Sequence, residues 1–252
     1  MERFEKMIRY IGLLPYRIGE YGVKTVFYKL IVDISLKLGF EKHIPDEVRW
    51  CAAHQFHTSW KLSQKSVYGS EEYNRRIDEK SLEVLNDFYE TGADFTGKKV
   101  LDVGCGTRGI LPVIKADLKL GIDPTIEKVK HFFDFPTCGI YISEKAENLS
   151  LEDNTMDIVA CNNTLNHVED PELVLAQIQR VLKPGGLLLL EVFIEPMNIA
   201  HTHEFNECSL TKLLSKYYTP ILVKYEQLKV KVEIDEKLDG KLPMRWGGVF
   251  QK

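Results

Sequence analysis

Three glycines, at positions 104, 106 and 109, follow a short apolar run in residues 100–109, VLDVGCGTRG. Glycines at this spacing let the backbone turn sharply and approach a bound ligand without a side chain in the way. The next apolar run ends at Asp123, whose carboxylate would bind the ribose hydroxyls of an adenosine. This spacing predicts an adenosine-containing cofactor bound at the turn after the first strand.

Asp102, two residues before the first glycine, restricts the choice of cofactor. A dinucleotide places its pyrophosphate against this kind of turn, where a carboxylate would repel it. S-adenosylmethionine contains no phosphate and carries a positive ammonium and a positive sulfonium, which Asp102 would attract directly or through water. Asp102 therefore favours methyl transfer, with a nicotinamide-dependent oxidoreductase of the same topology as the alternative.

Short apolar runs alternate with helix-sized segments from residue 98 onward, and these elements must position the loop. The runs KKVLDVG, LKLGID, GIYIS, MDIVACN and GLLLLEVFI are rich in leucine or β-branched residues, as buried strands are. Before the last run, Asp170 and Pro171 predict the start of a helix whose buried stripe is Val174, Ile178 and Val181. Apolar strands that alternate with helices indicate a parallel sheet covered on both faces.

Residues 1–97 have a helical pattern and predict an N-terminal cap on an α/β domain of residues 98–252. Leu82, Leu85 and Tyr89 mark the third helix of this cap, which closes near Gly92. Residues 1–40 carry seven Lys or Arg against four acids, so peripheral contact with a membrane surface is one interpretation. Packing on the main domain or on a partner is favoured, because the apolar residues are not confined to one narrow face.

The composition argues against several classes of protein. The 252 residues carry a formal charge of −4, which disfavours a general nucleic-acid binder. Five scattered cysteines and an opening without a secretory signal predict a reduced, cytoplasmic protein. The sequence contains no apolar run near the roughly 18 residues that span a bilayer. The sequence does not indicate an oligomeric state.

Residues 98–195 resemble the class I S-adenosylmethionine-dependent methyltransferases. VLDVGCGTRG is similar to the first motif of this family, LGIDP to the second, AENLSLEDNTMDIV to the adenine-binding segment, CNNTLNHVEDP to the turn after the fourth strand, and VLKPGG to the turn before the fifth. The resemblance implies S-adenosylmethionine as cofactor and an α/β fold with a doubly wound, mostly parallel, seven-stranded Rossmann-like sheet. The antiparallel pair of that sheet would come from PILVKYEQLKVKVEI and RWGGVFQK.

The same resemblance implies a cofactor site along the carboxyl ends of the strands. Asp123 would hold the ribose, and Glu147 would receive the exocyclic amine of adenine beside a backbone contact at Ala146. The usual third glycine falls at position 108, where this chain has Arg108, a candidate for the methionine carboxylate. The residues expected to bind the cofactor are Asp102, Gly104, Cys105, Gly106, Arg108, Gly109, Asp123, Pro124, Ala146, Glu147, Asn162 and Asn163.

Histidines are the candidate bases, since a base is needed only where the acceptor must lose a proton. His203 in AHTHEF follows the fifth strand at the mouth of the cleft, and His167 in LNHVEDP lies beside the cofactor. His167 also fits a packing role without chemistry. Glu191 either faces the cleft or ends the buried run, and the sequence does not choose between the two.

A small-molecule or carrier-linked acceptor is predicted, first at oxygen and next at carbon or nitrogen. CNNT lacks the Pro-Pro-aromatic tetrapeptide of the amino-group methylases in the resembling family, and it lacks an acid for a magnesium ion. The residues predicted to contact the acceptor are His201, Tyr68, Tyr73 and Arg76. No metal is expected. Cys51, His54 and His57 would supply three ligands, but zinc needs a fourth, and no motif in the sequence provides one. A methyltransferase-like scaffold without catalysis is the third interpretation, and the intact cofactor motif argues against it.

Overall fold

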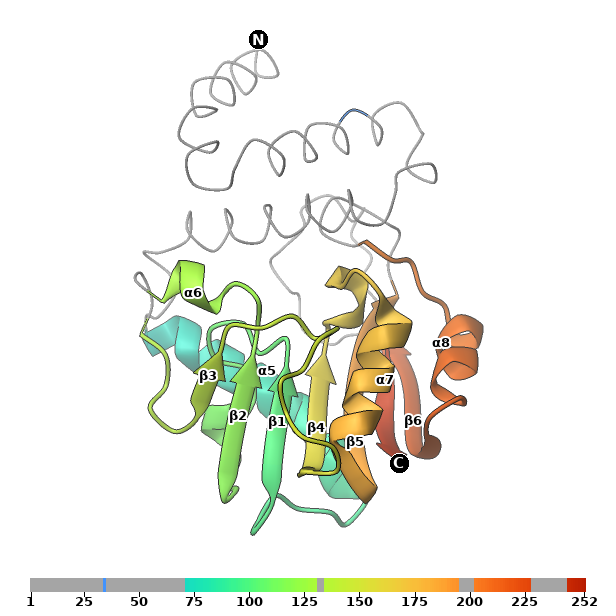
Figure 1. Ribbon diagram of the computed structural model, residues 1–252, viewed down its shortest axis with the longest axis horizontal. Coiled ribbons are helices and arrows are strands. Elements are labelled where there is room, and N and C mark those ends of the chain that lie inside the picture. Colours follow the sequence, from blue (N-terminus) through green and yellow to red (C-terminus); the bar gives the residue numbers. More distant parts are fainter. Residues whose placement is uncertain (1–33, 35–70, 131–133, 195–201, 228–243) are drawn as a thin grey trace.

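The computed structural model describes residues 34, 71–130, 134–194, 202–227 and 244–252. Their centre is a seven-stranded sheet with the strand order β3-β2-β1-β4-β5-β7-β6 (Figure 1). The strands are β1 Lys99–Val103, β2 Leu118–Ile122, β3 Ile140–Ile142, β4 Met156–Asn162, β5 Leu182–Ile194, β6 Thr219–Gln227 and β7 Met244–Gln251. The chain reverses its direction of winding between β1 and β4, which confirms the predicted doubly wound, Rossmann-like fold.

One strand runs against all the others. β1 pairs in parallel with β2 and β4, β2 with β3, and β4 with β5. β7 is antiparallel to both β5 and β6, which confirms the antiparallel pair expected near the C-terminus. The carboxyl ends of the parallel strands consequently lie along one edge of the sheet, where the arrows of Figure 1 point.

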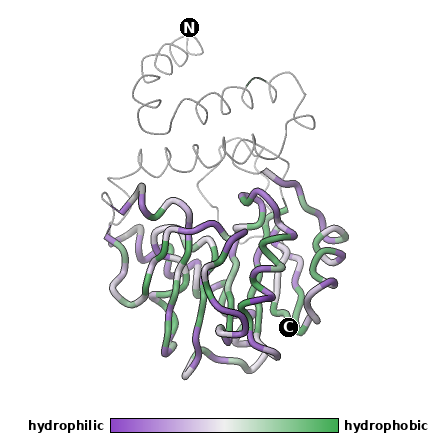
Figure 2. The backbone as a smooth tube through the Cα atoms, viewed as in Figure 1, coloured by the Kyte–Doolittle hydropathy of each residue, from purple (hydrophilic) through white to green (hydrophobic). Residues whose placement is uncertain are grey.

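Helices cover both faces of the sheet. α7 Pro171–Val181 and α8 Glu207–Leu214 pack on one face, and α5 Glu71–Glu90 packs on the other. The short helix α6 Ile126–Val129 follows β2. Apolar residues concentrate along the strands between these layers (Figure 2), because the strands are shielded from water on both sides.

Helix α7 begins and packs as its sequence predicts. The side chain of Asp170 accepts a hydrogen bond from the backbone N–H of Leu173 at its N-terminus. Val174, Ile178 and Val181 are fully buried, as expected for the inward stripe. The helix ends at Val181, three residues before Pro184.

Helix α5 is the predicted third helix, and it ends just before Gly92, which has a φ of 78°. Of the three residues that mark this helix in the sequence, Leu85 is buried, whereas Leu82 and Tyr89 are exposed. The face against the sheet is made by Ser81, Val84, Leu85 and Phe88, which follow the i, i+3, i+4, i+7 spacing. Leu82 and Tyr89 each lie one residue beyond that stripe and are therefore rotated by about 100° from it.

Candidate functional site

The glycine loop, residues 104–109, leaves β1 at the carboxyl edge of the sheet. Gly104, Gly106 and Gly109 have φ values of 74°, 59° and 57°, which glycine adopts without steric cost. A Cβ at Gly104 would collide with the Thr164 side chain, and a Cβ at Gly109 would collide with the carboxylate of Asp102. Both ends of the loop thus require glycine for space as well as for conformation.

Asp102 stabilises the far end of this loop. Its side chain is buried, and Oδ2 accepts a hydrogen bond of 2.8 Å from the backbone N–H of Ile110. Burial, with a smaller contribution from the nearby Asp123, raises the pKa of this carboxyl to about 7, although the hydrogen bond from Ile110 acts in the opposite direction. The sequence suggested an electrostatic role toward the cofactor, and the structure shows a second role that the sequence did not reveal.

Asp123 lies beside the loop, at the carboxyl end of β2. Its Oδ2 accepts the backbone N–H of Gly106 at 3.1 Å, and its Oδ1 accepts the backbone N–H of Thr125 at 2.8 Å. These bonds orient the carboxylate against the loop, and its role toward the ribose stays a prediction. Pro124 follows on the same edge, whereas Cys105 is buried and packs its sulfur against β2 at Gly121.

Glu147 joins two loops on the same edge of the sheet. Its Oε1 accepts the backbone N–H of Glu169 at 2.7 Å and that of Asp170 at 3.4 Å. Within the described residues its Oε2 has no hydrogen-bond partner, so this oxygen is available to accept a hydrogen bond from a ligand. Ala146 beside it is buried.

The end of β4 carries two amide oxygens that lack partners. Oδ1 of Asn162 and Oδ1 of Asn163 are buried and accept no hydrogen bond from any described residue. Asn163 also has a left-handed backbone, with a φ of 48°. Buried acceptors without partners are uncommon and call for an explanation, and residues in a left-handed conformation are frequent at functional sites. The acids and amide oxygens of this edge fit the donors of S-adenosylmethionine, which are its ribose hydroxyls, its adenine amine and its ammonium group.

Arg108 is held by helix α5, and the sequence did not predict this. Its Nε and one terminal nitrogen donate to the two carboxylate oxygens of Asp78 at 2.6 and 2.7 Å. The pair is separated by 30 residues in sequence, so no local pattern could have revealed it. Asp78 therefore joins the candidate site through Arg108.

His203 contacts the loop after β4. Its Nε2 lies 3.0 Å from the carbonyl oxygen of Val168 and 3.2 Å from that of Glu169. Carbonyl oxygens only accept, so Nε2 carries the proton and the lone pair of the neutral ring is on Nδ1. His167 ends a short 3-10 helix, Leu165–His167, at the same edge.

The residues predicted to contact the acceptor are only partly described. Tyr68 and His201 lie outside the described residues, as do Cys51, His54 and His57. Tyr73 and Arg76 lie in the first part of α5, and Arg76 is exposed. These assignments remain predictions.

Glu191 belongs to a buried charged cluster between the sheet and α5. Its Oε2 lies 3.5 Å from Nε of Arg245 on β7, and Arg245 also contacts Asp87 of α5. All three side chains are buried, and burial raises the pKa of Glu191 to about 7. Glu191 was singled out from the sequence, but isolated charges such as Arg245 and Asp87 gave no signal.

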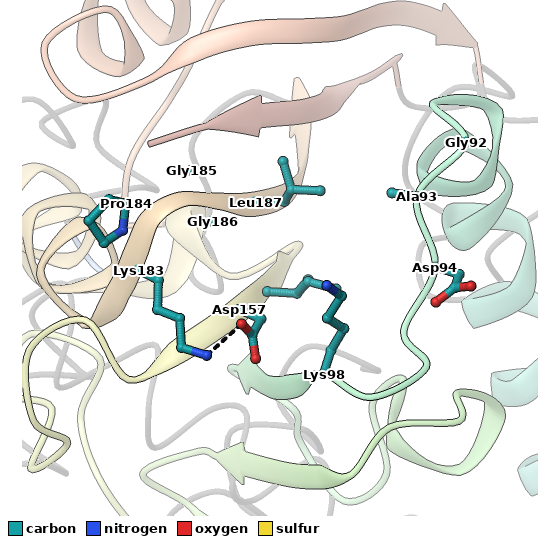
Figure 3. A pocket seen from close by; sticks show the side chains of 11 residues that line it. Gly92, Ala93, Asp94, Lys98, Asp157, Lys183, Pro184, Gly185, Gly186 and Leu187 are labelled. Atoms are coloured by element: carbon teal, nitrogen blue, oxygen red, sulfur yellow. Dashed lines mark hydrogen bonds and ion pairs between the residues drawn. The ribbon is translucent and has the colours of Figure 1, made fainter.

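A cavity of about 410 Å³ lies at the opposite edge, by the amino ends of β1, β4 and β5. Lys183 and Asp157 point toward each other across part of it and form a 2.6 Å ion pair (Figure 3). Lys98 and Asp94 also line it, so its charges balance. Ligands of open parallel sheets bind at the carboxyl ends of the strands, so this cavity is separate from the candidate site.

Two features are absent from the described ranges. Within them, no helix is long and apolar enough to cross a membrane. Nor do three His, Cys, Asp or Glu side chains there gather as metal ligands.

Comparison with known proteins identifies the class. A family model described as "Methyltransferase domain" matches residues 101–190. Two proteins named ubiquinone biosynthesis O-methyltransferase are similar: one of Aliivibrio fischeri (strain MJ11) is 35% identical over 122 residues, and one of Xanthomonas oryzae pv. oryzae (strain PXO99A) is 31% identical over 151 residues. These matches cover 45% and 55% of this chain and 50% and 62% of the relatives. The chain thus spans between half and two thirds of the length of the relatives it matches.

A solved structure confirms the fold independently. The cyclase SpnF superimposes with a TM-score of 0.55 at 18% sequence identity, over 73% of this chain and 83% of that protein. The fold and the glycine loop agree with this match, so residues 101–190 lie in a class I S-adenosylmethionine-dependent methyltransferase domain. S-adenosylmethionine is the methyl donor of this class, which confirms the predicted cofactor, whereas the role of Asp102 toward it stays a prediction.

Proposed function

We propose that this chain transfers the methyl group of S-adenosylmethionine to an oxygen of a small-molecule or carrier-linked acceptor. The observation that carries the proposal is the convergence of the glycine loop, Asp123 and Glu147 at one edge of the sheet, beside the buried oxygens of Asn162 and Asn163. The choice of oxygen is supported by the names of the similar proteins, which are O-methyltransferases.

Each part of the candidate site has a distinct task in this proposal. The glycine loop brings its backbone close to the cofactor, Asp123 accepts from the ribose, and Oε2 of Glu147 accepts from the adenine amine. Positioning of donor and acceptor supplies much of the rate of an in-line displacement, because it removes the entropic cost of bringing them together. When bound, S-adenosylmethionine supplies the methyl: the acceptor oxygen bonds to the methyl carbon, the carbon–sulfur bond breaks with its electron pair on sulfur, and the hydroxyl proton leaves.

His203 is the proposed base for that proton. Its Nε2–H is already used on the carbonyl oxygens of Val168 and Glu169, which fixes the ring and leaves Nδ1 as the accepting nitrogen. His167 is the second candidate on the same edge. The acceptor would bind beside this edge, where helix α5 reaches the glycine loop.

The test is a transfer assay with methyl-labelled S-adenosylmethionine. Phenols, sugar hydroxyls and primary amines would serve as acceptors, with products identified by mass spectrometry. Label on a hydroxyl oxygen and matching formation of S-adenosylhomocysteine support the proposal. Label on amines alone contradicts the choice of oxygen, and hydride transfer with a nicotinamide cofactor contradicts methyl transfer itself.

A further inference from the structure

Helix α5 contacts the glycine loop at two successive residues. The Asp78 carboxylate receives two hydrogen bonds from the Arg108 guanidinium, at 2.6 and 2.7 Å. One helical turn further, Oγ of Ser81 donates to the carbonyl oxygen of Gly109 at 3.2 Å. The helix thus holds both the side chain and the backbone of the loop's last two residues.

Three separate elements fix this end of the loop. The hydroxyl of Tyr141, on β3, donates to the carbonyl oxygen of Arg108 at 3.2 Å, and Asp102, on β1, accepts the N–H of Ile110. Asp78, on α5, is the third contact, which it makes through the side chain of Arg108. Because β1 and β3 belong to the sheet, the contacts from α5 are the ones that, among the described residues, connect this end of the loop to a helix.

The Asp78–Arg108 pair differs from an ordinary surface ion pair. Its side chains are only 27% and 19% exposed, and two parallel hydrogen bonds fix the plane of the guanidinium. Bidentate pairs shielded from water are stronger and more directional than exposed ones. On the same helix, Arg75 and Glu79 form a pair of 2.6 Å that is 62% and 60% exposed, which provides a matched comparison.

We propose that Asp78 is a positioning residue for cofactor binding: through Arg108 it holds the glycine loop in the conformation that accepts S-adenosylmethionine. This inference rests on the proposed function only in that the loop binds this cofactor. Arg108 occupies the position of the third glycine in the resembling family. The two hydrogen bonds to Asp78 direct the long side chain of Arg108 toward α5. Arg108 then acts by fixing the loop, in contrast to the direct contact with the methionine carboxylate suggested by the sequence.

The two roles for Arg108 predict opposite results for Asp78→Asn. If Asp78 positions the loop, this variant binds S-adenosylhomocysteine about 10-fold more weakly, because one of two charge-assisted bonds is lost and the other weakened. Asp78→Glu, which keeps the charge, restores most of the affinity, whereas Glu79→Gln binds like the wild type. If Arg108 contacts the cofactor directly, Asp78→Asn frees it, and an unchanged or tighter dissociation constant overturns the inference.

Titration calorimetry measures these constants, with melting temperatures recorded for each variant. If Asp78→Asn fails to fold, amide hydrogen exchange of ligand-free Arg108→Lys decides. Lysine cannot form the bidentate bond, so the amides of residues 106–110 should exchange about 10-fold faster than in the wild type. Unchanged exchange overturns the inference. Absence of binding by the wild type would instead refute the proposed function, so the two failures are distinguishable.

Discussion

The carboxylate of Asp102 accepts a hydrogen bond from the backbone N–H of Ile110, 2.8 Å away, across the base of the glycine loop. A buried acid therefore closes the loop that approaches the cofactor. It also makes the stability of the fold depend on pH, because burial raises its pKa to about 7.

The first prediction is that stability falls as the pH rises from about 4 to about 7. The pKa values of Asp102 and Glu191 are both raised in the folded state, so the folded protein keeps protons that the unfolded chain has lost in this range. Each group contributes a loss on the order of 3–4 kcal/mol. Urea unfolding at several pH values should show a shallower decline for Asp102→Asn and for Glu191→Gln. The exposed control Asp134→Asn should keep the full slope, and equal slopes in all four proteins would contradict the prediction.

The second prediction concerns Gly104→Ala, which should destabilise the protein by about 2–4 kcal/mol. The variant combines a φ of 74° with a collision against Thr164. Gly97→Ala is the matched control, because Gly97 has a φ of 71° and open space around its Cβ position. It should cost only about 1 kcal/mol. Similar losses of unfolding free energy in the two variants would show that the Thr164 side chain moves aside for a Cβ at position 104, which would contradict the prediction.

The third prediction is that Glu147→Gln weakens S-adenosylhomocysteine about 10-fold while hardly changing stability. Glutamine keeps one oxygen for the N–H groups of Glu169 and Asp170 but places a donor where the adenine amine should donate. Calorimetric titration and thermal melting separate the two effects. A wild-type dissociation constant would remove Glu147 from the adenine site.

The fourth prediction separates a base from a structural histidine at position 203. His203→Gln keeps a donor for the carbonyl oxygens of Val168 and Glu169 but lacks Nδ1. If His203 is the base, turnover falls about 10²–10⁴-fold in both His203→Gln and His203→Ala, with S-adenosylhomocysteine binding unchanged. If His203→Gln keeps its turnover and His203→Ala loses it, the prediction is contradicted. The role of His203 is then the hydrogen bond to the carbonyl oxygens of Val168 and Glu169, and not proton transfer.

Local patterns predicted most of the fold and much less of the site. The strands and α7 could be read from apolar runs and from a capping Asp170, because burial and capping leave marks within a few residues. The contact face of α5 was harder, since Leu82 and Tyr89 are apolar and yet exposed. The pairs Asp78–Arg108 and Asp87–Arg245 join charges from distant elements, and only the folded chain brings them together.

The central claim, that this edge of the sheet binds S-adenosylmethionine, is tested most directly by titrating the wild type and Asp123→Ala with S-adenosylhomocysteine and with NAD. The wild type should bind one S-adenosylhomocysteine per chain and no NAD. Asp123→Ala should bind it more weakly by about 2–4 kcal/mol, because the ribose loses its charged acceptor. Thermal melting must show that this variant is folded, since Asp123 also orients Gly106 and Thr125. Binding of NAD alone, or an unchanged dissociation constant in folded Asp123→Ala, would contradict the assignment of this site.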